Sequence, residues 1–155
     1  MNPLQKPAGN KTAEHKNVVR QSMAALRLRK HADYQRAYAA SRKRQSASMS
    51  WFLASQDPAA NRAALPRIGL TAGKVLGKAH ERNRIKRRMR EALRRHVELV
   101  PEGCDLILHP RRSVLTMEFA KLEAEIVRIL QQAKIEASRG EQKPALHVAS
   151  TKPAS

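Results

Sequence analysis

The sequence predicts an α+β fold in which helices pack on one small mixed sheet. Short apolar segments with the two-residue alternation of strands occur in the first half of the chain. Two longer segments instead repeat their apolar residues at the 3.6-residue period of a helix. The expected order of elements is α-β-β-β-α-β-α. No internal repeat is visible, and 155 residues suit a single domain.

The two ends of the chain differ from its centre. Residues 1–22 and 138–155 are rich in Lys, Gln, Pro and Ser and show no sustained apolar period. Segments of such composition cannot bury enough apolar surface to offset the conformational entropy that the chain loses when it becomes ordered. We therefore expect a disordered basic tail at 1–22, a folded domain at 23–137 and a second disordered tail at 138–155.

The first helix is expected within Leu26–Ala40. Asp33 is a good N-cap residue, so the helix is expected to begin near it. Tyr34 and Tyr38 are four residues apart and therefore share one face. Packing in the core and stacking on unpaired nucleobases are both open interpretations of these rings.

Two of the three strands in this order can be placed after the first helix. In Ser48–Ser55, large apolar residues occupy every second position, which predicts a strand. Phe52 faces away from Trp51, so one ring can pack in the core while the other lies on an open face of the sheet. Asp57–Ala64 is expected to be a loop, and Arg67–Ala72 a second strand.

Gly73 and Gly77 interrupt the pattern after this strand. A phosphate-binding P-loop has four residues between its glycines and a Ser or Thr after its lysine. Here three residues lie between the glycines, and Ala79 follows Lys78. A plain turn and an RNA-contacting loop both remain open for this segment.

The most basic segment of the chain is expected to be a helix over Ala79–Leu99, ending before Pro101. Its apolar stripe is formed by Ile85, Met89, Leu93 and Val97. A run of charged residues is ordinarily interpreted as a solvated helix face. This run contains very few acidic residues among its basic ones, which favours a surface that binds phosphate groups. The cations of this helix are Arg82, Arg84, Lys86, Arg87, Arg88, Arg90, Arg94 and Arg95.

Two elements complete the fold. Asp105–His109 is a short apolar run stopped by Pro110 and is expected to be a strand. Thr116–Ala137 repeats apolar residues at helical spacing and is the clearest amphipathic helix of the chain.

Composition narrows the class of partner. The chain has 31 Lys and Arg against 13 Asp and Glu, giving a formal net charge of +18. Such an excess favours a nucleic acid, whose counterions are released on binding. No stretch approaches the roughly 18 apolar residues of a membrane span, so no membrane partner is expected. One cysteine, Cys104, excludes an internal disulfide, and no apolar segment follows the N-terminal lysines; a cytoplasmic location is expected.

No self-sufficient catalytic site is visible. The six histidines show no metal-ligand spacing, so we expect no metal site. Glu118, Glu123 and Glu125 lie on the last predicted helix, where a solvated face is expected rather than acid–base chemistry. We therefore expect no catalytic residue and no cofactor bound by the protein alone.

Several motifs together resemble one family. Arg67–Thr71, Gly77 and Glu81–Glu91 are similar to the signature of the protein component of bacterial ribonuclease P. The Tyr34–Tyr38 pair and the segment Asp105–Arg111 agree with that family's pattern. The resemblance covers about 26–137 of the chain.

The resemblance implies a fold and an activity. The fold would be that of ribosomal protein S5 domain 2, with a left-handed β-α-β crossover instead of the usual right-handed one. The RNA subunit would carry the active site and its magnesium ions. The protein would help to remove the 5′ leader from precursor tRNA, so its partners would be the ribonuclease P RNA and the leader, with no small-molecule substrate.

The resemblance also implies residue roles. Tyr34, Tyr38 and Phe52 would line a leader-binding cleft between helix and sheet. The family often has two lysines where this chain has Lys74 and Val75, so Val75 is not expected to be a contact. The residues implied for binding the RNA subunit are Arg82, Asn83, Arg84, Lys86, Arg87 and Arg90, with Lys74 and Thr71 from the preceding segment.

Two other classes of protein remain as alternatives. A ribosomal or general RNA-binding protein would have the same charge but would not favour leader-bearing tRNA. A protein-only nuclease would need clustered acids or histidines to hold its metal ions, and the sequence offers no such cluster.

Overall fold

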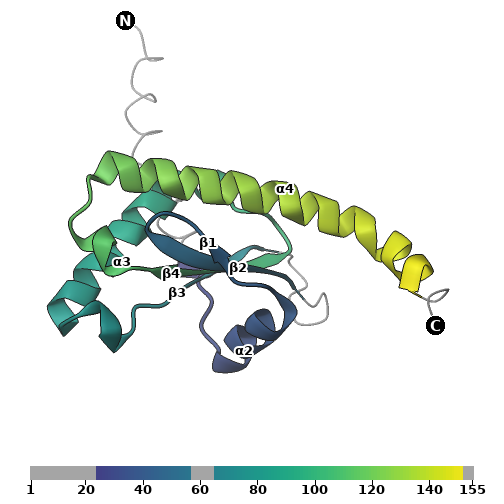
Figure 1. Cartoon of the computed structure of the whole chain (residues 1–155), viewed down its shortest axis with the longest axis horizontal. Helices are drawn as coiled ribbons and strands as arrows, with labels where there is room; N and C mark the ends of the chain where they lie inside the picture. The colour runs from purple at the N-terminus through teal and green to yellow at the C-terminus, as the bar shows by residue number, and fades with distance from the viewer. Residues whose placement is uncertain (1–23, 57–64, 152–155) are drawn as a thin grey trace, which may run out of the picture.

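The computed structural model describes residues 24–56 and 65–151, with side chains up to 139. The main elements follow the predicted order α-β-β-β-α-β-α (Figure 1). They are α2 (His31–Ala40), β1 (Arg44–Gln45), β2 (Met49–Ser55), β3 (Arg67–Leu70), α3 (Ala79–Arg95), β4 (Cys104–Pro110) and α4 (Phe119–Thr151). Within the described residues, no helix is long and apolar enough to cross a bilayer.

The four strands form one mixed sheet in the order β1-β2-β4-β3. β2 pairs antiparallel with β1 and β4, whereas β3 and β4 are parallel. Parallel neighbours need a crossover, and α3 lies in the connection between β3 and β4. The mixed sheet is therefore confirmed, and the left-handed sense of the crossover stays a prediction from the family resemblance.

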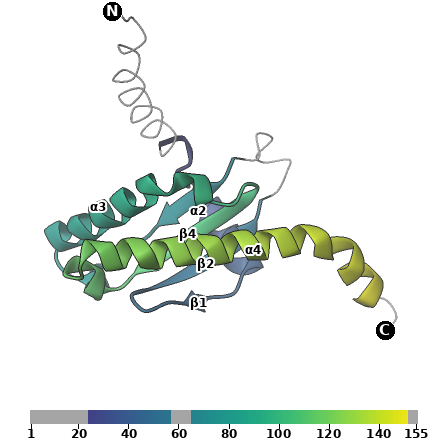
Figure 2. The same cartoon turned by 90° about the horizontal axis from the view of Figure 1, so that it is seen from above.

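Helices cover both faces of the sheet. α3 and α4 lie side by side on one face, and α2 lies against the other (Figures 1 and 2). The larger core joins Met49 and Trp51 of β2 to apolar residues of α3 and α4. The smaller core, on the α2 side, contains Ala54 and Ile107 and packs against Phe52. Trp51 and Phe52 thus face opposite sides of the sheet, as their alternation predicts.

Two helix boundaries differ from the sequence predictions. α2 begins at His31 after Lys30, so Asp33 is not its N-cap. The Asp33 carboxylate instead accepts a hydrogen bond from Arg67 (3.1 Å). α3 ends at Arg95, because the backbone leaves helical geometry at His96, and Val97 falls in a short 3₁₀ turn rather than on the apolar stripe.

The C-terminal helix is longer than expected. α4 continues from Phe119 to Thr151, so the tail predicted to be disordered from residue 138 is helical as far as Thr151. The segment after Ala137 contains Gly140 and Pro144, which disfavour a helix, so its composition does not account for this extension. The predicted tail at 1–22 and the predicted loop at 57–64 lie outside the described residues.

Glu125 was expected on a solvated face and is instead buried, at 2% exposure. Its carboxylate accepts hydrogen bonds from the Ser46 hydroxyl (2.6 Å), the Ser48 amide (2.9 Å) and the Ser48 hydroxyl (2.7 Å). These donors lie in the turn between β1 and β2. The buried carboxylate therefore joins α4 to the β1–β2 hairpin, because a buried charge needs such partners.

Candidate nucleic-acid interface

The register of α3 is fixed by its apolar stripe. Ile85, Met89, Ala92 and Leu93 are each at most 1% exposed and belong to the larger core. Residues between these positions must point to the flanks or outward. The helix therefore presents its basic side chains away from the core, as predicted.

Three of the α3 cations make contacts within the protein. Arg88 donates to the Met117 carbonyl oxygen. Arg94 donates to a Glu91 carboxylate oxygen (2.6 Å). Arg95 contacts the carboxylates of Glu91 and Glu123 and lies 4.8 Å from the ring centre of Phe119. The Arg94 contact lies within α3, whereas Arg88 and Arg95 join α3 to the segment before α4 and to α4 itself.

The other α3 cations have no hydrogen-bond or ion-pair partner among the described residues, and Asn83 is exposed among them. Positive charge without an acidic neighbour produces the strongest attraction for an anion. The same residues are those that the family resemblance implies for RNA binding. They are Arg82, Arg84, Lys86, Arg87 and Arg90.

A clamp fixes the start of α3. Glu81 accepts hydrogen bonds from the Lys78 amide (3.0 Å) and from Arg112 (2.6 Å), and Arg112 also donates to the Leu76 carbonyl (2.7 Å). The Arg112 hydrogen bond is the main cause that lowers the pKa of Glu81. Gly77 has φ +127°, and a Cβ there would lie 2.3 Å from Arg112 Nη1, so glycine is required. No pattern in the sequence indicates this role for Arg112.

Lys74 and Thr71 lie before this clamp. Lys74 is exposed in a 3₁₀ turn, Lys74–Leu76, whose middle residue, Val75, is 92% exposed. The Thr71 amide donates to the Leu108 carbonyl (3.1 Å) and so prolongs the pairing of β3 with β4. Neither Lys74 nor Thr71 lines the groove described next.

A groove of about 920 Å³ runs along the β3 edge of the sheet. Residues 27–29 form one wall. This segment is held to β3, because the Leu28 amide donates to the Ile68 carbonyl (2.9 Å) and the Ile68 amide to the Leu26 carbonyl (2.7 Å). α3 forms the opposite wall. Basic side chains line both walls, and apolar side chains lie between them. The basic lining residues are Arg27, Arg29, Lys86, Arg87, Arg90 and Arg94; the apolar ones include Leu28, Ile68, Leu70 and Leu93.

Arg27 and Arg29 are functional candidates that the sequence analysis missed. The sequence contains a pattern that could have indicated them, because they alternate with Leu26 and Leu28 as residues of a strand do. The leucines are buried and the arginines are exposed.

The three aromatic residues predicted for leader binding are brought together. The ring centres of Tyr34 and Tyr38 are 6.3 Å apart, and those of Tyr38 and Phe52 are 4.9 Å apart. Tyr34 also lines the groove, whereas Tyr38 and Phe52 do not. Tyr34 is thus the residue at which the basic groove meets the aromatic row Tyr34–Tyr38–Phe52.

Gly69 allows Tyr34 to lie against β3. A Cβ on Gly69 would be 2.7 Å from Tyr34 Cε1 and 2.9 Å from its hydroxyl oxygen. The Tyr34 hydroxyl donates to the Leu28 carbonyl (3.2 Å), which also ties the ring to the groove wall.

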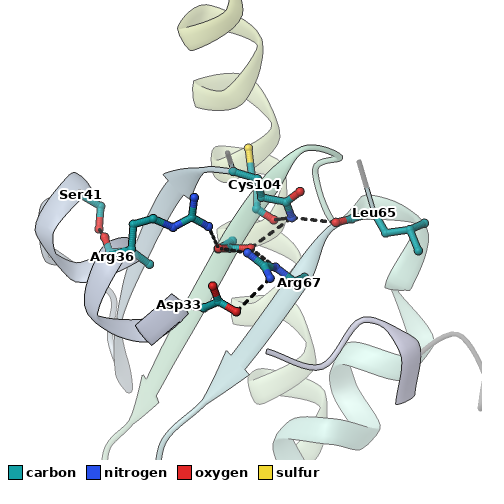
Figure 3. Close-up of polar contacts among 9 residues, drawn as sticks. Asp33, Arg36, Ser41, Leu65, Arg67 and Cys104 are labelled. Atoms are coloured by element: carbon teal, nitrogen blue, oxygen red, sulfur yellow. Dashed lines mark hydrogen bonds and ion pairs between the residues drawn. The ribbon is translucent and has the colours of Figure 1, made fainter. Parts of the chain in front are cut away.

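A polar network fixes α2 to the sheet (Figure 3). Arg67 donates to both carboxylate oxygens of Asp105 (2.8 and 2.9 Å) and to Asp33 in α2 (3.1 Å). Arg36 of α2 also contacts Asp105 (3.5 Å). The hydrogen bond to Asp105 is the main cause that raises the pKa of Arg67. Since Tyr34 follows Asp33, this network also positions the aromatic row.

The described residues contain no group of three or more His, Cys, Asp or Glu side chains arranged to hold a metal ion. What the site offers is unpaired positive charge, an apolar groove and a row of rings. This combination suits single-stranded nucleic acid, because cations follow the backbone while bases stack on aromatic faces.

Comparisons with known proteins agree with this description. A family model described as Ribonuclease P matches residues 23–134. A ribonuclease P protein component of Chloroflexus aggregans is 36% identical over 110 residues, covering 70% of this chain and 78% of the relative. That of Chlamydia trachomatis is 40% identical over 67 residues, covering 43% of this chain and 54% of the relative.

Solved structures show the same fold. The RNase P protein of Staphylococcus aureus has a TM-score of 0.59 at 26% identity, covering 70% of this chain and 95% of that protein. The RNase P protein of Thermotoga maritima has a TM-score of 0.59 at 23% identity, covering 68% and 96%. The α+β architecture, the basic helix and the extent of these matches lead to one conclusion: this chain belongs to the ribonuclease P protein family.

Proposed function

We propose that this protein is the subunit of ribonuclease P that assists a catalytic RNA in removing the 5′ leader from precursor tRNA. One observation carries the proposal: Lys86, Arg87 and Arg90, which have no partner in the described part of the chain, border a groove that meets a row of aromatic rings at Tyr34. Phosphates and unpaired bases each find a complementary surface there.

The proposal divides the interface into two surfaces. The exposed flank of α3, represented by Arg82, Asn83 and Arg84, faces the ribonuclease P RNA. The groove and the aromatic row face the leader of the precursor. Lys86, Arg87 and Arg90 line the groove and lie between the two RNAs, so their charges reduce the repulsion between them.

Binding energy from the leader distinguishes precursor from product. A base stacked on an aromatic side chain contributes roughly 1–3 kcal/mol, and mature tRNA has no leader to stack. Contacts made only by the precursor favour its binding over that of the product. In this proposal the chain supplies binding and orientation, while the RNA holds the active site and its magnesium ions. The proposed place of action is the cytoplasm, where precursor tRNA would be processed.

The test is cleavage of a precursor tRNA at low magnesium concentration by bacterial ribonuclease P RNA, with and without the protein. Accurate removal of the leader only when both components are present supports the proposal. Tight binding to RNA without any rescue of cleavage overturns it and favours a ribosomal or general RNA-binding protein. Cleavage by the protein alone would overturn the assignment of the active site to RNA.

A further inference from the structure

His109 adds a fourth ring to the aromatic row. It lies in β4, and its ring centre is 5.6 Å from that of Tyr38 and 5.3 Å from that of Phe52. Its Nε2 is 2.8 Å from the Tyr38 hydroxyl oxygen. Two of the three side chains predicted for leader binding therefore contact His109, to which the sequence analysis assigned no role.

The surroundings favour the neutral imidazole. Burial lowers the pKa of His109, and the charge of Lys43 acts in the same direction. Burial also raises the pKa of Tyr38, so its hydroxyl stays protonated at neutral pH. A neutral imidazole has one nitrogen that accepts and one that donates. Because a phenol hydroxyl is a stronger hydrogen-bond donor than acceptor, we assign the Tyr38 hydroxyl as the donor to Nε2, which leaves the imidazole proton on Nδ1.

The Nδ1–H group has no hydrogen-bond partner among the side chains and backbone groups described for residues 24–56 and 65–139. The His109 side chain is only half-buried, so part of its surface is accessible to a ligand. A half-buried donor beside a row of aromatic rings is suited to an acceptor atom on the edge of a nucleobase. A base with a donor at that edge would leave both groups without a partner.

We propose that His109 is a base-contacting residue of the leader site, with its ring in the aromatic row and its Nδ1–H donating to an acceptor atom of one leader nucleobase. The inference rests on the proposed function, since it needs a leader in the groove. It adds a preference for base identity at one leader position to the general affinity that charge and stacking provide.

The experiment compares base preference in the reconstituted holoenzyme. Precursor tRNAs that differ only in the base at one leader position are bound to holoenzyme containing wild-type protein, His109→Phe or His109→Gln. Phenylalanine keeps a ring without nitrogens, and glutamine keeps a donor without the ring. Tyr38→Phe serves as a matched comparison, because it removes the hydroxyl and leaves Nδ1 in place.

The wild-type holoenzyme is expected to prefer certain bases at one leader position by about 3- to 10-fold, the size of one net hydrogen bond. His109→Phe should abolish that preference and leave the affinity for mature tRNA unchanged, while His109→Gln should retain part of it. An identical base profile in wild type and His109→Phe overturns the role of His109. An equal loss of affinity for mature tRNA would show a purely structural role and would also overturn it.

These outcomes are distinct from failure of the proposed function. If the wild-type holoenzyme binds precursor and mature tRNA equally, the leader-binding function itself is wrong. If it favours the precursor with no base preference at any leader position, only the inference about His109 is wrong.

Discussion

Arg67 and Asp105 form a paired contact across two parallel strands, with Nε to Oδ1 at 2.8 Å and Nη2 to Oδ2 at 2.9 Å. Asp105 is 1% exposed, and a buried carboxylate needs such a partner. The third arm of the guanidinium, Nη1, reaches Asp33 at 3.1 Å. One arginine thus ties β3, β4 and α2 together, and with them the position of the aromatic row.

Replacing Arg67 is expected to destabilise the fold strongly. Arg67→Met leaves the buried Asp105 carboxylate without its main partner, which should lower the free energy of unfolding by about 3 kcal/mol. Urea denaturation measures the change. Arg87→Ala, at an exposed position, is the control and should stay within about 0.5 kcal/mol of wild type. Equal small effects of both variants would contradict the role assigned to Arg67.

Adding one methyl group at Gly69 is expected to displace Tyr34. The new Cβ would lie 2.7 Å from the tyrosine ring, so the ring or the backbone must shift. Gly69→Ala should cost about 1–3 kcal/mol of stability. It should also weaken binding of precursor tRNA without changing affinity for the RNA subunit, as measured by fluorescence titration with each RNA. Unchanged precursor affinity would show that Tyr34 does not contact the leader.

Arg84 and Tyr38 are expected to act on different RNAs. Arg84→Ala removes an exposed cation of α3 with no partner in the described residues and should weaken assembly with the ribonuclease P RNA. Tyr38→Ala removes a stacking surface and should mainly weaken precursor binding, by roughly 1–3 kcal/mol. Arg95→Ala is a matched control, since Arg95 already contacts Glu91 and Glu123. Equal effects of Arg84→Ala and Tyr38→Ala on assembly would contradict the division into two surfaces.

Binding to the ribonuclease P RNA should depend steeply on salt. If about six phosphates are contacted, the logarithm of affinity should fall against the logarithm of salt concentration with a slope of about −4 to −5. Filter binding over a range of salt concentrations measures the slope, and Arg84→Ala should make it shallower by about one. A slope near zero for the wild type would rule out an electrostatic interface.

The stability of the fold should fall in mild acid because of His109. Burial lowers the pKa of His109 in the folded state, so below the unfolded value of about 6.5 the unfolded chain binds more protons. Above that pH the imidazole is neutral in both states and the free energy of unfolding keeps its full value. It decreases as the pH falls toward the pKa of His109 in the folded state. Urea denaturation at pH 7.5 and pH 5 should show a larger loss for wild type than for His109→Phe. The same loss in both proteins would show that a group other than His109 causes the loss of stability in acid.

Local pattern was enough to predict the order of elements and the face of α3 that packs. The stripe Ile85, Met89 and Leu93 follows from helical period alone, and the opposite orientation of Trp51 and Phe52 follows from strand alternation. The aromatic row and the RNA-binding residues came from the family resemblance, and their proximity is now seen in the structure, whereas their roles stay predictions.

Contacts between distant residues could not be predicted in the same way. Glu125 is buried because Ser46 and Ser48, almost eighty residues earlier in the chain, surround its carboxylate. The partner of His109 lies 71 residues away in α2. Likewise, nothing in the basic run distinguishes Arg88, which binds the Met117 carbonyl, from its neighbour Arg87, which has no partner in the described residues. Tertiary packing decides each of these cases.

The most direct test of the leader-binding groove is the ratio of holoenzyme affinities for precursor and mature tRNA, measured with leaders of decreasing length. The account predicts a ratio that favours the precursor and falls toward one as the leader is shortened. It also predicts that Tyr34→Ala lowers the ratio while assembly with the RNA subunit is retained. Equal affinity for precursor and mature tRNA at every leader length would contradict the account.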